Sequence, residues 1–197
     1  MELSFVLASK SPRRRVLLTE AGFNFSVVPP SIDESFRPGE IPRDHVLRLS
    51  REKARAVAVS YPDNWVLGAD TIVMIDGEVL GKPKSPQDAR DMLWKLSGRE
   101  HRVLTGFTLV KECINVVMSE AVESRVLFKT IPDDEIEWYI QTSEPYDKAG
   151  GYAVQGMAAF FIREIHGSYT NVVGLPLSEV VESLKRVGAV NFHKRDQ

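Results

Sequence analysis

The sequence predicts a mixed α/β fold, in which a twisted sheet is flanked by helices. Three observations support this class. Short apolar runs rich in β-branched residues alternate with helical segments that carry capping signals, and a meander of alternating residues follows in the middle of the chain. The 197 residues are 43% hydrophobic and 26% charged, which suits a globular protein with one substantial core, or a core extended into two lobes. We expect one domain at residues 1–190 and a polar tail at 191–197.

Turn and capping residues set the expected boundaries of these elements. Pro12 and Pro86 each follow a serine, a pattern that is favoured where a helix begins. Asp76-Gly77 is the strongest hairpin signal in the chain. The expected strands are 3–8, 23–28, 65–67, 71–75, 78–80, a three-stranded antiparallel meander at 101–110, 114–118 and 121–128, and 158–165; the expected helices are 12–21, 42–60, 86–97, 132–140 and 177–187.

The charge balance and the cysteine count exclude several classes of protein. The chain has 25 Lys and Arg against 27 Asp and Glu, a net charge of -2, which argues against a protein that coats nucleic acid. The single cysteine, Cys113, excludes an intrachain disulfide and a cysteine metal cluster, and it lies in an expected turn. No segment has the pattern of a signal peptide or a membrane span. We therefore expect a cytoplasmic protein that does not act at a membrane.

The helix expected at Pro12 has an unusual charge at its start. Arg13, Arg14 and Arg15 occupy the first turn, where the helix dipole disfavours each positive charge by about 0.3–1 kcal/mol. A sequence tolerates this arrangement more readily if an anion binds there. The preceding turn contains Ser9, so hydroxyl, guanidinium and backbone N–H groups can converge into a phosphate site. The alternative is a solvated basic turn.

One carboxylate and two ammonium groups interrupt the apolar β pattern of residues 66–84. Asp70 is expected in a break between two apolar segments, where it is either a local turn former or a catalytic or metal-binding group at a strand end. Pro83 favours an extended conformation at Lys82, so Lys82 and Lys84 are expected to project to the same side. Two ammonium groups placed in this way repel each other unless an anion lies between them.

Three further candidates are polar residues in helix and loop segments. Lys53 lies on the inward stripe of its helix, where it either covers apolar surface or points into a cleft. The loop acid Glu34 is either solvated or a metal ligand. Gln155 lies in a loop with three glycines that permits close approach of a ligand, and its amide can both donate and accept, as recognition of a base requires.

Together these residues indicate a site for a nucleoside triphosphate and a divalent cation. Cationic side chains neutralise phosphate oxygens, hard carboxylate oxygens hold Mg²⁺ or Mn²⁺, and an amide can read a base. The sequence contains no GxxxxGK[ST], GxGxxG or HExxH motif, which argues against P-loop nucleotidases, dinucleotide enzymes and zinc proteases.

Seven motifs are spread over nearly the whole chain, namely Leu7 to Arg14, Glu52-Lys53-Ala54, Gly68-Ala69-Asp70-Thr71, Gly81-Lys82-Pro83, Leu96-Ser97-Gly98, Glu144 to Gly150 and Val173 to Leu177. In this order they resemble the Maf family of nucleotide pyrophosphatases. The resemblance implies the fold of inosine triphosphate pyrophosphatases (Maf/Ham1), with two lobes around a cleft, and hydrolysis of a nucleoside triphosphate to the monophosphate and pyrophosphate.

Within the family, Gln155-Gly156 together with Arg13 and Thr71 resembles the branch that prefers dTTP and UTP. Modified pyrimidine nucleotides are further possible substrates. The branch that acts on 7-methyl-GTP has a different glycine-loop sequence and is the second choice. Gly151 departs from the pattern, because relatives usually have Ala there.

On this resemblance, Asp70 is expected to orient or deprotonate the attacking water, as the proton acceptor of the reaction. Glu34 and Asp70 would help to hold a divalent metal cation. Arg13, Thr71 and Gln155 are the candidates for substrate specificity. The candidates for phosphate binding are Ser9, Arg13, Arg14, Lys53 and Lys82.

Two further expectations concern role and assembly. The family is also associated with inhibition of septum formation, so a non-catalytic nucleotide-binding regulator is the alternative from another class. A house-cleaning enzyme linked to arrest of cell division would combine both roles. We also expect a homodimer as the possible assembly of this protein.

Overall fold

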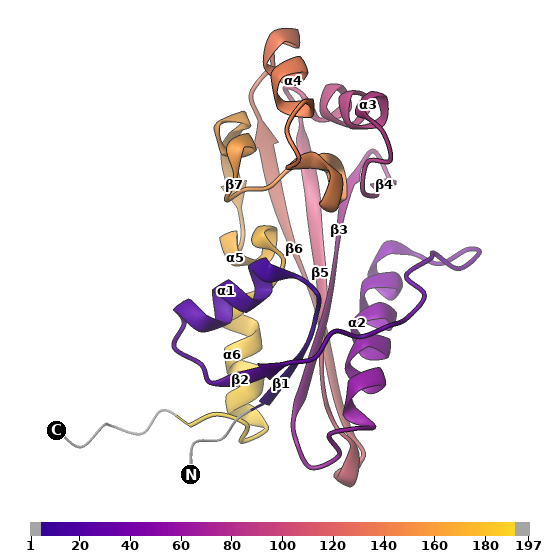
Figure 1. Cartoon of the computed structure of the whole chain (residues 1–197), viewed down its shortest axis with the longest axis vertical. Coiled ribbons are helices and arrows are strands. Elements are labelled where there is room, and N and C mark those ends of the chain that lie inside the picture. Colours follow the sequence, from indigo (N-terminus) through magenta and orange to yellow (C-terminus); the bar gives the residue numbers. More distant parts are fainter. Residues whose placement is uncertain (1–4, 192–197) are drawn as a thin grey trace, which may run out of the picture. The chain divides into compact units, whose positions relative to one another are not determined.

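A computed structural model describes residues 5–191 of the chain (Figure 1). Strands and helices alternate along most of the sequence, as expected for a mixed α/β protein. The elements are β1 (Phe5–Ala8), α1 (Pro12–Glu20), β2 (Phe25–Val27), α2 (Pro42–Ala58), β3 (Val66–Ile75), β4 (Glu78–Leu80), α3 (Pro86–Leu96), β5 (Glu100–Lys111), β6 (Val116–Phe128), α4 (Asp133–Ile140), β7 (Ile162–His166), α5 (Tyr169–Val173) and α6 (Leu177–Arg186), with short 3₁₀ helices at Glu112–Ile114, Pro145–Asp147, Ala149–Gly151 and Met157–Phe161.

The strands within residues 5–191 form a seven-stranded mixed sheet in the order β2-β1-β3-β5-β6-β7, with β4 paired to β3. β1 runs parallel to both β2 and β3, with Leu7 opposite Val27 on one side and Leu67 on the other. β3 and β4 form the hairpin predicted at Asp76-Gly77, and both turn residues have positive φ. The predicted fold class, a twisted mixed sheet with flanking helices, is therefore confirmed.

The chain divides into two compact units. Unit 1 contains the described residues up to Asp70, Gly106–Ala121 and the described residues from Gly174 onward, and unit 2 contains Thr71–Thr105 and Val122–Val173. The strands β3, β5 and β6 each contribute residues to both units. Two units agree with the expected two lobes, whereas the expected cleft stays a prediction.

In unit 1, helix α2 packs closely against the strands. Val6 and Ala8 of β1 form a buried cluster with Ala54 and Val57 of α2, and Figure 1 shows α2 on one side of these strands with α1 and α6 on the other. The close packing of α2 against β3 depends on a glycine in the strand. A Cβ at Gly68 would lie 2.3 Å from the Ser50 carbonyl oxygen on α2, so only glycine permits this approach of helix and strand.

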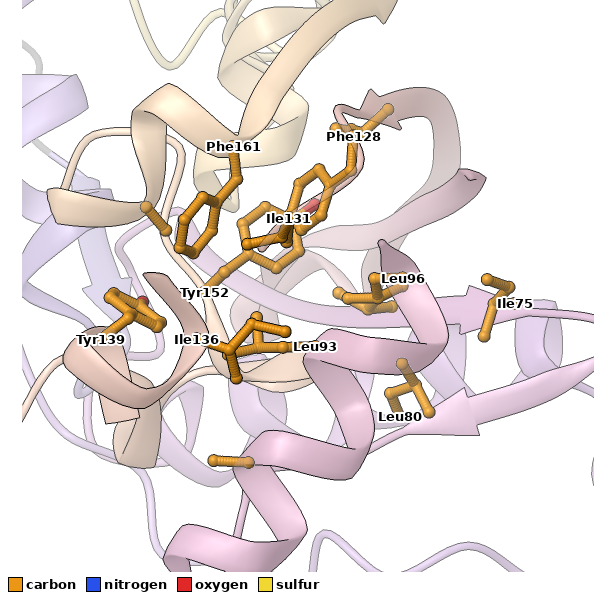
Figure 2. Close-up of a cluster of buried hydrophobic side chains, with 14 of the residues drawn as sticks. Ile75, Leu80, Leu93, Leu96, Phe128, Ile131, Ile136, Tyr139, Tyr152 and Phe161 are labelled. Carbon is orange, nitrogen blue, oxygen red and sulfur yellow. The ribbon is translucent and has the colours of Figure 1, made fainter. Parts of the chain in front are cut away.

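Unit 2 has a core of aromatic and aliphatic side chains (Figure 2). Leu93 and Leu96 of α3 pack with Ile136 of α4, and the Phe128 and Phe161 rings lie nearby. All five side chains are at most 1% exposed. The helical spacing of apolar residues predicted both helices, because each presents one apolar stripe to this core.

Three sequence-based boundaries are wrong. No break separates 65–67 from 71–75, because β3 is continuous through Asp70. The expected meander is a pair of long strands, since 114–118 and 121–128 both belong to β6, and the turn is made by Glu112–Ile114 with Asn115 in the left-handed region. The segment 158–165 is a strand only from Ile162, because a 3₁₀ helix precedes it.

The serines expected to cap α1 and α3 differ in their hydrogen bonding. Ser11 is the N-cap residue of α1, but its side chain makes no capping hydrogen bond, whereas Ser85 accepts one from the Asp88 N–H at 3.1 Å. Helix α5 was not predicted. Residues 3–4 of the first strand and 192–197 of the expected polar tail lie outside the described residues. Nothing in the described part of the chain forms a helix with the length and apolarity that crossing a bilayer requires.

Candidate active site

Lys53, Asp70 and Glu34 form an ion-paired cluster in unit 1. The Lys53 Nζ lies 2.7 Å from Asp70 Oδ1 and 2.8 Å from Glu34 Oε1. The Lys53 and Asp70 side chains are 7% and 10% exposed, whereas the Glu34 side chain is 51% exposed. The lysine predicted on an inward stripe therefore points at charge rather than covering apolar surface. Its ammonium joins a buried strand carboxylate to a carboxylate on a surface loop.

Gly68 explains how Lys53 reaches Asp70. Both residues lie where α2 and β3 pack against each other, and Gly68 lets the helix backbone approach the strand two positions before Asp70. The pair is thus built into the helix–strand interface. Because a buried charge is stable only when it is paired, Lys53 and Asp70 each require the other.

Arg14 is the buried arginine of the first turn of α1. Its Nε donates to the Gly174 carbonyl oxygen at 2.7 Å, and its Nη1 lies 3.4 Å from Ser9 Oγ. Burial lowers the pKa of Arg14, the neighbouring Arg13 lowers it further, and the carboxylates of Asp70 and Glu34 raise it. The phosphate candidates Ser9, Arg13 and Arg14 therefore belong to the same unit as the acids, with Ser9 in contact with Arg14 and Arg14 coupled electrostatically to both carboxylates.

The other candidates, Thr71, Lys82 and Gln155, belong to unit 2. Thr71 Oγ1 lies 2.9 Å from Thr105 Oγ1, and the buried Thr105 hydroxyl also donates to the Asn171 carbonyl oxygen at 3.3 Å. Thr71 is thereby fixed to β5. Lys82 and Gln155 are exposed side chains on loops.

Unit 2 brings two sequence motifs together that are far apart in the chain. The Gly150 N–H donates to the Gly81 carbonyl oxygen at 3.0 Å, directly before Lys82. Gly150 and Gly151 have φ values of 69° and 70°, and a Cβ at Gly151 would lie 3.1 Å from the Pro83 ring. The left-handed backbone predicted for the glycine loop is confirmed at these two positions, and it seats the loop against the residues around Lys82.

Glu144 holds the part of this loop that carries Gln155. Its carboxylate accepts from the Met157 N–H at 2.8 Å, the Ala158 N–H at 3.2 Å and the Tyr139 hydroxyl at 3.0 Å. A Cβ at Gly156 would lie 2.3 Å from both Glu144 oxygens. The carboxylate also caps the 3₁₀ helix where a strand was expected, which explains that wrong boundary.

The carboxylates of Glu34 and Asp70 in unit 1 are candidate ligands for a divalent cation. Glu34 and Asp70 would supply two hard carboxylate ligands, and the two carboxylates lie close together because both contact the Lys53 ammonium group. Nowhere in residues 5–191 do three or more Asp, Glu, His or Cys side chains come together as a complete metal site. Mg²⁺ is commonly held by one or two carboxylates, with substrate phosphates as further ligands. The pair therefore fits a cation that arrives with a nucleotide.

Sequence reasoning singled out the charged residues and missed several that position them. Gly68 belongs to the motif Gly68-Ala69-Asp70-Thr71, but its role depends on a contact with α2 that no local sequence pattern reveals. Glu144 belongs to a motif as well, yet only the structure shows its carboxylate around Gly156. The side chains that order the Glu34 loop were not identified at all.

The seven-stranded mixed sheet with flanking helices places the chain in a class of α/β proteins whose fold is also seen in a solved Ham1 structure. The Ham1 protein from Coxiella burnetii aligns over 93% of this chain and 99% of its own, with a TM-score of 0.55 and 14% sequence identity, which concerns the fold alone.

The model of the family described as "Maf-like protein" matches residues 4–187, and the chain belongs to this family. It is 60% identical to a dTTP/UTP pyrophosphatase from Syntrophus aciditrophicus (strain SB), over 95% of this chain and 91% of the relative. It is 54% identical to a dTTP/UTP pyrophosphatase from Geobacter sp. (strain M21), over 95% of this chain and 97% of the relative. The predicted family is confirmed.

Proposed function

We propose that this chain is a dTTP/UTP pyrophosphatase, which hydrolyses these nucleotides to the monophosphate and pyrophosphate. The single observation that carries the proposal is the similarity over nearly full length to relatives of that name, at 60% and 54% identity. The cluster of Lys53, Asp70 and Glu34 beside Arg14 supplies the charges that such a reaction needs. Modified pyrimidine nucleotides are further candidate substrates.

In the proposed reaction, a water oxygen forms a bond to the α-phosphorus and the bond from the α-phosphorus to the bridging oxygen breaks. Asp70 orients or deprotonates this water as the proton acceptor. Lys53, Arg14 and Arg13 stabilise the negative charge that develops on the pyrophosphate leaving group, and Ser9 and Lys82 bind its oxygens. Removing one such preorganised donor should raise the barrier by about 3 kcal/mol.

Specificity and the metal are assigned to separate groups of residues. Arg13, Thr71 and Gln155 discriminate among nucleotides, with the Gln155 amide as the group that reads the base. Glu34 and Asp70 would hold Mg²⁺ or Mn²⁺, which when bound neutralises phosphate charge. The proposed setting is the cytoplasm, with a homodimer as the proposed assembly and no role for nucleic acid.

The test is a screen of nucleoside triphosphates for released pyrophosphate, with Mg²⁺ or Mn²⁺ present. We expect dTTP and UTP to lead, and 7-methyl-GTP to be a poor substrate. Higher turnover of 7-methyl-GTP would overturn the assigned branch.

A second comparison separates an enzyme from a non-catalytic regulator. We expect Asp70→Asn to retain dTTP binding, measured by calorimetry, while turnover is lost. An Asp70→Asn protein with full turnover would refute the assigned base. A wild-type protein that binds dTTP without hydrolysing it would favour the regulator.

A further inference from the structure

The loop that carries Glu34 needs an anchor other than Glu34 itself. Residues 28–41, between β2 and α2, form no helix or strand. Glu34 contacts Lys53 at 2.8 Å, but its side chain is 51% exposed, and an ion pair that is half exposed to water contributes little to order. A long irregular loop loses much conformational freedom when it is fixed. Other contacts must therefore place Glu34.

Glu40 is the hub of such contacts at the end of the loop. Its side chain is 8% exposed, and its carboxylate accepts from Arg48 Nε at 2.5 Å and Arg48 Nη2 at 2.7 Å. It also accepts from the Arg37 N–H at 3.2 Å and lies 2.9 Å from His45 Nδ1. The hydrogen bonds from Arg48 lower the pKa of Glu40 far below its usual range, with smaller contributions from His45 and Arg37. The carboxylate is thus ionised and tightly held to α2.

Arg48 connects this hub to the residues that adjoin Glu34 and Lys53 in the chain. Its Nη2 donates to the carbonyl oxygen of Ser35, the residue after Glu34, at 3.0 Å. Its Nη1 donates to Glu52, the residue before Lys53, at 3.2 Å. One guanidinium therefore fixes the backbone beside the acid and a side chain beside the lysine. The planar guanidinium of Arg48 has several N–H donors in fixed directions, so it can bind these groups at once, whereas a lysine ammonium group would not hold them in the same geometry.

The turn around Glu34 has two further constraints. Asp33 Oδ1 accepts from the Ser35 N–H at 2.9 Å, which closes a tight turn across Glu34. The Phe36 ring stacks on the imidazole of His45, with ring centroids 3.4 Å apart and planes inclined by 1°. His45 is 2% exposed and belongs to α2, so it offers a rigid surface for the loop.

We propose that Arg48 and Glu40 are positioning residues, which hold the Glu34 loop so that its carboxylate meets Lys53 and the cation-binding position. This inference rests on the proposed function, in which Glu34 is a metal ligand. Neither side chain touches the substrate in this scheme. Displacement of a reacting group by about 1 Å can cost on the order of 100-fold in rate, so a positioning residue has a measurable effect.

A double-mutant cycle tests the proposal. The variants are Arg48→Met, Glu34→Gln and their combination, assayed for pyrophosphate release from dTTP as a function of Mg²⁺ concentration. We expect Arg48→Met to lower kcat/KM by at least about tenfold and to raise the Mg²⁺ concentration for half-maximal activity. In the Glu34→Gln background the same change should have no further effect, because the acid that it positions is already absent.

Arg90→Met is the matched control. Arg90 makes a comparable two-pronged contact with Glu137 in unit 2, where its Nη2 donates to Glu137 Oε2 at 2.7 Å. We expect this variant to keep wild-type activity and Mg²⁺ dependence. Equal losses in Arg48→Met and Arg90→Met, or an Arg48→Met loss that persists in full in the Glu34→Gln background, would overturn the proposal.

Hydrogen exchange of the loop gives a readout that does not depend on activity. Amides of residues 31–37 should exchange faster in Arg48→Met and in the milder Glu40→Gln, which retains the shape of the hub. Unchanged exchange in both variants would overturn the proposal. If the wild-type protein releases no pyrophosphate from any triphosphate, the proposed function fails, while this exchange experiment still decides whether Arg48 and Glu40 order the loop.

Discussion

Replacement of Lys53 by Met should lower both the stability of the protein and its catalytic activity. Methionine keeps the length and the apolar stem of the side chain but removes the ammonium group that joins Asp70 to Glu34. Asp70 is 10% exposed and would be left as a buried carboxylate without its direct partner. Loss of one partner from a buried pair typically costs about 3–5 kcal/mol of stability.

The structure places the expected loss at the lower end of this range. Arg14 is coupled electrostatically to Asp70 and remains in the variant, so the buried carboxylate keeps one nearby positive charge. The Glu34 half of the cluster is 51% exposed and contributes at most about 1 kcal/mol. We therefore expect Lys53→Met to lower the free energy of unfolding by about 3 kcal/mol, measured by urea denaturation at pH 7, and to abolish dTTP turnover.

The double variant Lys53→Met, Asp70→Leu completes the test. Because an apolar pair of similar volume can replace a buried ion pair without loss, stability should return to within about 1 kcal/mol of wild type while turnover remains absent. Arg55→Met, an exposed change on the same helix, serves as the control and should shift stability by less than about 0.5 kcal/mol. A Lys53→Met protein with wild-type stability or wild-type turnover would refute the assigned role of the pair.

Three other substitutions test separate parts of the structure. Gly68→Ala should force α2 away from β3, which lowers both the melting temperature and dTTP turnover. Gly156→Ala places a Cβ against the Glu144 carboxylate and should raise KM for dTTP more than it lowers kcat; an unchanged KM would contradict the clamp. Burial lowers the pKa of His101 to about 4 from its usual 6.5, so the folded state binds fewer protons than the unfolded state between these values and stability is lost as pH falls through them. His101→Gln, which cannot titrate, should gain about 3 kcal/mol of unfolding free energy relative to wild type on going from pH 7 to pH 4, measured by urea denaturation at each pH.

The sequence predicted those parts of the fold that depend on local chemistry. Pro12, Pro86 and Asp76-Gly77 marked boundaries that the structure confirms, because capping and turn preferences act within a few residues. Asp70 was misplaced in a break, since a charged residue within an apolar run argues against a buried strand. The Lys53 ammonium, supplied by another element, pairs with the Asp70 carboxylate and makes that position tolerable.

The same reasoning applies to the candidate site. The types of residue were visible in the sequence, because positive charge at a helix start and acids in apolar runs violate ordinary preferences. The contacts that place these side chains were not visible. Arg48 and Glu40 look like ordinary surface charges in the sequence, and Gly68 looks like an ordinary glycine. Their roles arise from contacts between elements, which periodicity does not encode.

The sharing of β3, β5 and β6 between the two units restricts how this architecture can be dissected or recombined. Each of these strands would be severed by any cut that releases one unit, and each fragment would keep unpaired strand edges prone to aggregation. Neither half can therefore serve as a portable module, and a chimera between relatives must exchange matched stretches of all three strands together.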